Sequence, residues 1–237
     1  MISSRSISAG RVLACACALF FALGLQAQQV RPSISILGDS YSTFEGYIPE
    51  GNAIWYRSPA DTTRTDVVDV EQTWWWQVIH DGGYRLCRNE AWSGSTVAFQ
   101  GMNGKDMEYC SFITRLPRMG NPDIILIYGA INDCRLGVPL GEYKYDNITR
   151  NDLNTYRPAL ARLLSDALKR YPNVRIYFII NDDMRDDIAT STKIICDHYA
   201  VPYIHLQPLE VRSGHPTAAG MRSIAQQVLG VIGKAQH

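Results

Sequence analysis

Five short apolar runs, each bounded by turn residues, alternate along the chain with longer segments of helical periodicity. The clearest run is 123–128 (DIILIY), which is almost entirely apolar and is followed by Gly129. A strand that is buried on both faces reads as a continuous apolar run of this kind. Together the runs predict five β-strands, at 33–37, 84–87, 123–128, 174–180 and 202–206.

The segments between these strands carry apolar residues on one helical face. Between Leu153 and Ala167, apolar residues recur at the spacing of a helix, and the same spacing runs from Met221 to Ile232 after Pro216 in an expected first turn. Helices are also predicted at 73–79 and 186–199. Strands that alternate with helices imply βαβ units, so we expect an α/β fold with a parallel sheet covered on both faces.

One connection is unusually long. Residues 41–71 show no clear period, and such loops are mostly functional or disordered. The loop is rich in aromatic residues, which argue against disorder. They suit two roles equally, stacking on sugar rings or forming a small core of the loop itself. These residues are Tyr41, Phe44, Tyr47, Trp55 and Tyr56.

The N-terminus has the features of a secretory signal. Arg5 and Arg11 precede an apolar stretch at 12–25, and the small residue Ala27 closes an A-x-A-like cleavage site, Leu25-Gln26-Ala27. The stretch is too short to cross a bilayer, which takes about 20 residues. We therefore predict a signal peptide at 1–27, a single domain at 28–237, and an exported protein, periplasmic or secreted, with no membrane span after cleavage.

Composition excludes several classes of protein. The chain has 237 residues, 46% of them hydrophobic and 19% charged, which fits a globular domain rather than a disordered chain or a coiled coil. Without residues 1–27 it keeps 21 basic and 23 acidic residues, a net charge of −2. A nucleic-acid partner is not expected, because phosphate binding needs a surplus of Lys and Arg.

The cysteines of the predicted mature chain do not form a metal-binding pattern. They lack C-x-x-C or Cys/His spacing, so no metal site is expected, and the sequence indicates no cofactor. Export permits disulfides, and four cysteines allow three pairings. Bridges and free buried thiols both remain open for Cys87, Cys110, Cys134 and Cys196.

Four polar clusters follow predicted strands. They are 38–40 (Gly-Asp-Ser), 89–95, 129–133 and 213–216 (Ser-Gly-His-Pro). Each alone is an ordinary turn or helix cap. In an open α/β sheet, however, ligands bind outside the carboxyl ends of the strands, so the four clusters are expected to meet at one edge.

With these blocks in this order, the chain resembles the SGNH (GDSL-type) hydrolases over the whole predicted mature length. The resemblance implies a flavodoxin-like three-layer sandwich with a five-stranded parallel sheet, and ester hydrolysis. It also implies that Ser40 is the nucleophile and His215 the general base. The backbone N–H groups of Ser40 and Gly94 and the side-chain amide of Asn132 would form the oxyanion hole.

One position departs from the family. The usual orienting Asp, three residues before the His, is Arg212 here, and a guanidinium cannot accept a hydrogen bond. The expected replacement is Glu210, with a main-chain carbonyl or an acid from elsewhere in the chain as alternatives. Because of this departure, a protein that has lost catalysis and only binds its ligand remains an alternative.

The expected activity is hydrolysis of a short acyl ester, acetyl in first place, on a glycan. Export, the family's common substrates and the aromatic loop all favour this reading. The residues expected to bind substrate are Asp39, Tyr41, Trp55 and Trp92. The alternatives are a lipid esterase or thioesterase and, from a different class, a glycan-binding protein on the same scaffold. The oligomeric state remains open.

Overall fold

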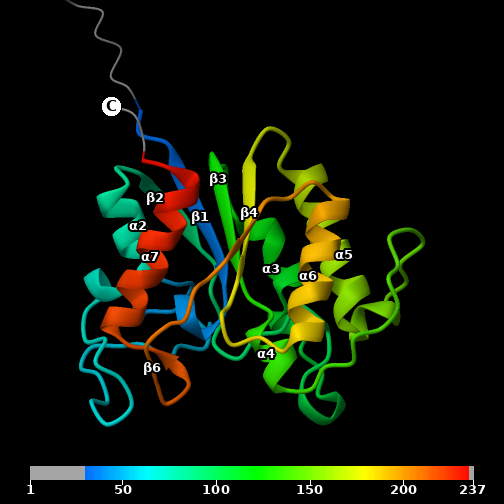
Figure 1. Cartoon of the computed structure of the whole chain (residues 1–237), viewed down its shortest axis with the longest axis horizontal. Coiled ribbons are helices and arrows are strands. Elements are labelled where there is room, and N and C mark those ends of the chain that lie inside the picture. The colour runs from blue at the N-terminus through cyan, green and yellow to red at the C-terminus, as the bar shows by residue number, and fades with distance from the viewer. Residues whose placement is uncertain (1–29, 235–237) are drawn as a thin grey trace, which may run out of the picture. The chain divides into compact units, whose positions relative to one another are not determined.

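Five parallel strands form the central sheet of the structure, a computed structural model that describes residues 30–234 (Figure 1). The spatial order is β2-β1-β3-β4-β5, the order of flavodoxin-like folds. The predicted fold class is confirmed, and the predicted signal peptide lies outside the described residues. The strands are β1 (Ser33–Gly38), β2 (Arg85–Asn89), β3 (Ile124–Tyr128), β4 (Arg175–Ile180) and β5 (Tyr203–His205).

Helices cover both faces of the sheet, so the domain has three layers. In Figure 1, α2 and α7 lie on one side of the sheet, and α3, α5 and α6 lie on the other. The six helices of the described chain are α2 (Trp74–Asp81), α3 (Phe112–Arg115), α4 (Ile131–Arg135), α5 (Tyr156–Arg170), α6 (Asp186–His198) and α7 (Ala218–Ile232). Short 3-10 helices lie at Ser40–Ser42, Val70–Gln72, Met102–Gly104, Glu108–Cys110, Leu116–Arg118 and Asp152–Asn154.

Alternation along the strands divides the interior into two apolar cores. In β3, Leu126 packs into the core under α2 and α7, whereas Ile125 and Ile127 pack into the core under α5 and α6. Every residue of β3 is buried. This explains why the central strands read as continuous apolar runs in the sequence.

The carboxyl ends of the strands carry short, irregular elements. The 3-10 helix Ser40–Ser42 follows β1, and α4 follows β3. Beyond β5 the chain forms a two-stranded hairpin, β6 (Val211–Arg212) and β7 (His215–Pro216). Both α4 and β6 lie at the lower edge of the sheet in Figure 1. The strand order reverses between β1 and β3, which is where open α/β sheets bind ligands.

The last helix begins later than the sequence predicts. Pro216 lies in β7 rather than in a first helical turn, and α7 begins at Ala218. The side chain of Thr217 caps it by accepting a hydrogen bond from the amide of Gly220. His215 therefore lies in the hairpin, two residues before the helix cap.

The long connection has a core of its own. Tyr41, Phe44 and Tyr56 are buried and pack with residues of α2 and α7, so the core role predicted for the loop aromatics holds for these three. Tyr47 is 42% exposed and contacts Trp76. Trp55 is half-buried and lies beside the site described below.

All four cysteines of the described chain are free. Three are buried and Cys87 is half-buried, so the free-thiol alternative holds in the structure. No helix within residues 30–234 is long and apolar enough to cross a membrane.

Candidate active site

The turn after β1 presents Ser40. Asp39 caps the 3-10 helix by accepting a hydrogen bond from the amide of Tyr41 at 3.0 Å. From α2, the indole N–H of Trp74 donates to the hydroxyl of Ser42 at 3.2 Å. A side chain at Gly38 would come within 2.4 Å of that hydroxyl, so this tight turn needs glycine.

Asp39 is a structural residue of this turn. It is 1% exposed, and burial raises the pKa of its carboxyl to about 7, although the hydrogen bond from Tyr41 opposes the shift. Asp39 therefore braces the turn in this structure, and its contact with substrate stays a prediction.

A two-residue hairpin turn brings His215 onto Ser40. Ser213 and Gly214 both have positive φ, 50° and 73°, which is the requirement of a type I′ turn. Arg212 pairs with His215 across the hairpin. The Ser40 Oγ–His215 Nε2 distance is 3.0 Å, which is the hydrogen-bond distance expected between a nucleophile and its base.

The outer nitrogen of the imidazole is bound by a main-chain carbonyl. His215 Nδ1 lies 3.1 Å from the carbonyl oxygen of Ser213, and this acceptor places the proton on Nδ1. The carboxylate of Glu210 instead accepts a hydrogen bond from the hydroxyl of Thr217 at 2.9 Å. The preference for Glu210 as the orienting acid is therefore wrong, and the carbonyl alternative holds. Arg212 is exposed on β6.

Three donors fix the hairpin to the body of the domain. The hydroxyl of Tyr41 and the guanidinium of Arg135 donate to the carbonyl of Gly214, at 2.8 and 2.9 Å. The hydroxyl of Tyr56 donates to the carbonyl of Pro216 at 2.9 Å. Tyr41 is 1% exposed and holds the histidine hairpin, and its contact with substrate stays a prediction.

Trp55 covers one face of the base. Its indole is stacked on the imidazole of His215, with ring centroids 3.5 Å apart and planes 11° apart. The guanidinium of Arg64 lies over the same indole, 4.1 Å from its centroid. Burial is the main cause that lowers the pKa of His215 to about 4. The hydrogen bond from Nδ1 to Ser213 opposes this shift, and the positive charges of Arg135 and Arg64 add to it.

The expected oxyanion donors lie on two neighbouring loops. Gly94 has φ of +81° and nothing within 4 Å of the position where a side chain would begin, so its backbone is open on that side. The side-chain amide of Asn132 donates one hydrogen to the carbonyl of Ser95 at 2.9 Å, which fixes its orientation and leaves the second hydrogen available. Asp133 is buried and accepts hydrogen bonds from the amides of Val97 and Ala98.

A buried arginine that the sequence did not single out joins these loops. Arg115 of α3 is 0% exposed. Its guanidinium donates to the carbonyls of Gly38 and Glu90 and to the hydroxyl of Ser95. It therefore ties the nucleophile turn to the loop that carries Gly94. The segment holds two arginines, Arg115 and Arg118, and no pattern in the sequence distinguishes the buried one from the exposed one.

Trp92 lies on the same loop, and its ring makes an edge-to-face contact with Tyr109 at 5.8 Å. Its contact with substrate stays a prediction. Within residues 30–234, no group of three or more His, Cys, Asp or Glu side chains is arranged to hold a metal ion.

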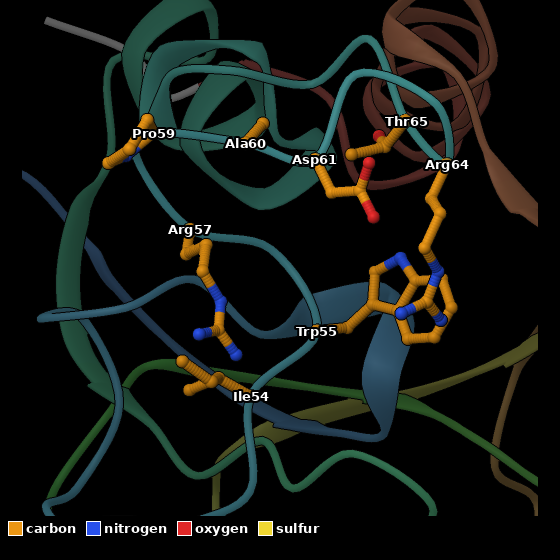
Figure 2. Close-up of a pocket in the computed structure, with 8 residues that line it drawn as sticks. All are labelled: Ile54, Trp55, Arg57, Pro59, Ala60, Asp61, Arg64 and Thr65. Carbon is orange, nitrogen blue, oxygen red and sulfur yellow. The ribbon is translucent and has the colours of Figure 1, made fainter.

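A pocket of about 400 Å³ opens beside Trp55, within the long loop (Figure 2). Two guanidinium groups and one carboxylate line it together with small and apolar residues. The lining residues are Ile54, Trp55, Arg57, Pro59, Ala60, Asp61, Arg64 and Thr65.

The chain matches a known family over most of its length. The model of the GDSL-like lipase/acylhydrolase family matches residues 32–232. A "putative GDSL-like lipase" from Bacteroides ovatus is 48% identical, with a TM-score of 0.84 over 86% of this chain and 99% of that one. Another from Bacteroides uniformis is 43% identical, with a TM-score of 0.84 over 86% of this chain and 96% of that one.

A more distant solved structure shares the fold alone. It is an acetyl xylan esterase from Butyrivibrio proteoclasticus, 12% identical, with a TM-score of 0.55 over 86% of this chain and 63% of that one. Among curated proteins, none matches the chain.

Proposed function

Because the chain belongs to the GDSL-like lipase/acylhydrolase family and is a carboxylic ester hydrolase, we propose that it removes a short acyl group, acetyl in first place, from a glycan. The observation that carries the mechanism is the 3.0 Å contact between Ser40 Oγ and His215 Nε2. An intact pair of this kind argues against the decayed, purely binding alternative.

In the proposed first step, Ser40 Oγ attacks the ester carbonyl carbon while its proton passes to His215 Nε2. The negative charge that develops on the carbonyl oxygen is met by the N–H groups of Ser40 and Gly94 and by the Asn132 amide. A donor of this kind contributes roughly 2.7–4 kcal/mol to the transition state. His215 then returns the proton to the sugar oxygen as the C–O bond breaks, which leaves an acyl group on Ser40.

In the proposed second step, His215 removes a proton from water, and the hydroxide attacks the acyl-enzyme. Collapse of this second intermediate releases the carboxylic acid and returns the proton to Ser40. The Ser213 carbonyl keeps the proton of the neutral imidazole on Nδ1, so Nε2 is a hydrogen-bond acceptor at the start of each step.

Two observations favour a glycan over a long-chain lipid. The pocket beside the base is lined by Arg57, Asp61 and Arg64, whose charges suit a hydroxylated ligand and oppose burial of an alkyl chain. An acetyl xylan esterase shares the fold. Long-chain esters and thioesters are the alternative substrates.

Export is part of the proposal and rests on the sequence of residues 1–27. We expect the full chain, expressed in a bacterial host, to be recovered outside the cytoplasm with an N-terminus near residue 28. Mass spectrometry of the recovered protein tests this. Retention of residues 1–27 in that protein would contradict it.

The test of the nucleophile is hydrolysis of 4-nitrophenyl acetate, butyrate and octanoate by the wild type and by Ser40→Ala. We expect acetate to be the best substrate and Ser40→Ala to lose at least about 10³-fold in kcat with an unchanged melting temperature. A serine-directed phosphonate should label Ser40. The matched control is Ser93→Ala on the neighbouring loop, which should remain active. Labelling at Ser93, or a preference for octanoate, would contradict the proposal.

A further inference from the structure

We propose that the pocket beside Trp55 is a subsite for an anionic sugar unit, so that the ester substrate is carried by an acidic glycan. This inference rests on the proposed function and deepens it by naming the substrate class. The anionic group is a carboxylate or a sulfate, because each presents a pair of oxygens that a guanidinium can bind through two hydrogen bonds.

The pocket adjoins the dyad through a shared side chain. Trp55 is both a wall of the pocket and the ring stacked on His215, 3.5 Å away. A sugar unit in the pocket would therefore be a neighbour of the unit whose ester reaches Ser40. The volume of about 400 Å³ lies within the range of pockets that bind small molecules.

The charged side chains that line the pocket differ in the partners they already have within the protein. The carboxylate of Asp61 accepts hydrogen bonds from the amide and the hydroxyl of Thr63, at 3.1 and 2.6 Å. Arg64 lies over the Trp55 ring, and its positive charge also acts on Asp61. The carboxylate of Asp61 therefore already has hydrogen-bond donors within its own turn and a positive charge, that of Arg64, nearby.

Arg57 is the group left for a ligand. Within residues 30–234, its guanidinium takes part in no ion pair and in no hydrogen bond to another side chain or carbonyl. Figure 2 shows Arg57 beside Ile54, apart from Asp61 in the view. With Arg64 across the pocket, the lining carries a net charge of +1, although the predicted mature chain is acidic overall. An unpaired cation in a pocket next to the base favours an anionic ligand group.

The first test compares three acetylated disaccharides that differ only at C6 of the unit without the ester. That unit is glucose, glucuronic acid or glucose 6-sulfate, linked to the same methyl glucoside, which is supplied as its separate mono-acetyl regioisomers. For the regioisomer that is hydrolysed best, we expect the wild type to prefer a charged sugar to the neutral one by about tenfold in kcat/KM. Whichever charged substrate, the one with the carboxylate or the one with the sulfate, has the higher kcat/KM identifies the anionic group that the pocket binds. Equal rates on all three sugars would overturn the subsite.

Substitutions of the pocket residues test which side chain causes the preference for a charged sugar. Arg57→Ala should bring the charged-to-neutral ratio close to one, mainly by raising KM for the charged sugar, because binding away from the reacting atoms is uniform along the reaction. Asp61→Asn should raise the ratio, since it removes the opposing charge. The matched control is Arg118→Ala, an exposed arginine before β3 at the opposite edge of the sheet, which should leave the ratio unchanged. A ratio that survives Arg57→Ala would contradict the assignment.

A binding measurement separates this inference from the proposed activity. Calorimetry with Ser40→Ala protein would compare trigalacturonic acid with neutral cellotriose. We expect at least tenfold tighter binding of the acid, lost in the Ser40→Ala/Arg57→Ala double variant. If the wild type hydrolyses none of the esters but this preference appears, the proposed function fails and the subsite stands. If esters are hydrolysed without any preference for charge in either assay, the subsite fails alone.

Discussion

In the proposed mechanism, His215 acts as the base without an orienting acid. A carboxylate next to a catalytic imidazole normally selects its tautomer and stabilises the imidazolium. Here the Ser213 carbonyl, 3.1 Å from Nδ1, selects the tautomer. Trp55 holds the plane of the ring by stacking on it. The partial negative charge of a carbonyl and the π face of an indole are both weaker counterions than a carboxylate, but both favour the imidazolium when it forms.

Glu210→Gln tests this arrangement at a single residue. Because the Glu210 carboxylate contacts Thr217 rather than His215, we expect kcat to stay within about tenfold of the wild type. His215→Ala should abolish turnover in the same assay with 4-nitrophenyl acetate. A loss of several orders of magnitude in Glu210→Gln, with its melting temperature unchanged, would instead make Glu210 the orienting acid.

The pH profile should report the environment of His215. In the proposed mechanism the neutral imidazole is the active form, so we expect kcat/KM to fall as the pH drops through its pKa. Burial lowers this pKa to about 4, so we expect the acid limb near pH 4 rather than near 6.5. Trp55→Ala exposes the ring and should move the limb upward, toward 6.5, while Trp55→Phe should largely restore it. Trp76→Ala is the matched control, because Trp76 is half-buried on α2. A limb that stays in place in Trp55→Ala would contradict this account.

At the scale of elements, the carboxyl edge depends on hydrogen bonds between loops. Arg115 of α3 donates to the carbonyls of Gly38 and Glu90 and to the Ser95 hydroxyl, which lie at the end of β1 and in the loop after β2. A main-chain acceptor left buried without a donor costs about 1–3 kcal/mol. The geometry of the proposed oxyanion hole thus depends on a residue outside it.

Arg115→Met tests that dependence. It preserves apolar bulk but removes these three hydrogen bonds, and within the described chain only the Gly38 carbonyl keeps another donor, the amide of Trp92, so we expect a loss of about 3 kcal/mol or more in the free energy of unfolding. In a domain of this size, that is a fall of about 6–12 °C in melting temperature, measured by circular dichroism. Arg118→Met, an exposed neighbour, is the control and should melt as the wild type does. Equal melting temperatures for the two variants would contradict the role given to Arg115.

The elements differ in how far the sequence predicts them. The five strands were predictable because a buried parallel strand has to be apolar on both faces, as the β3 run shows. The hairpin of β6 and β7 was not predicted, since both residues of β6 are exposed and two-residue strands have no period. Ser213-Gly214 is nonetheless a dipeptide that marks turns, and it was the available signal. The sequence could not predict that the Ser213 carbonyl binds His215, because every residue has a main-chain carbonyl.

At the scale of the whole molecule, the parallel sheet brings distant residues together. Ser40 and His215 are 175 positions apart and in hydrogen-bond contact. They meet because β1, β3 and β5 all end at the same edge, and the order of the polar clusters after the strands was enough to predict this. The contacts that position the dyad, from Trp55 and from the three donors to the hairpin, depend on side-chain packing and did not follow from the order of strands.

The thiols give a prediction for the molecule as a whole. A protein exported to an oxidising compartment can form disulfides, yet the structure leaves all four described cysteines free. Burial raises the pKa of Cys196 to about 12 and also raises that of Cys110, so neither is a reactive thiolate near neutral pH.

We expect the mature protein, purified without reductant and then denatured, to take up iodoacetamide at four cysteines, as counted by mass spectrometry. A sample reduced beforehand is the control and should give the same count. Excess dithiothreitol should leave the melting temperature unchanged, whereas loss of a disulfide worth about 2–4 kcal/mol would lower it by several degrees. Fewer than four labelled cysteines in the unreduced sample, together with such a drop, would show that a bridge holds the fold.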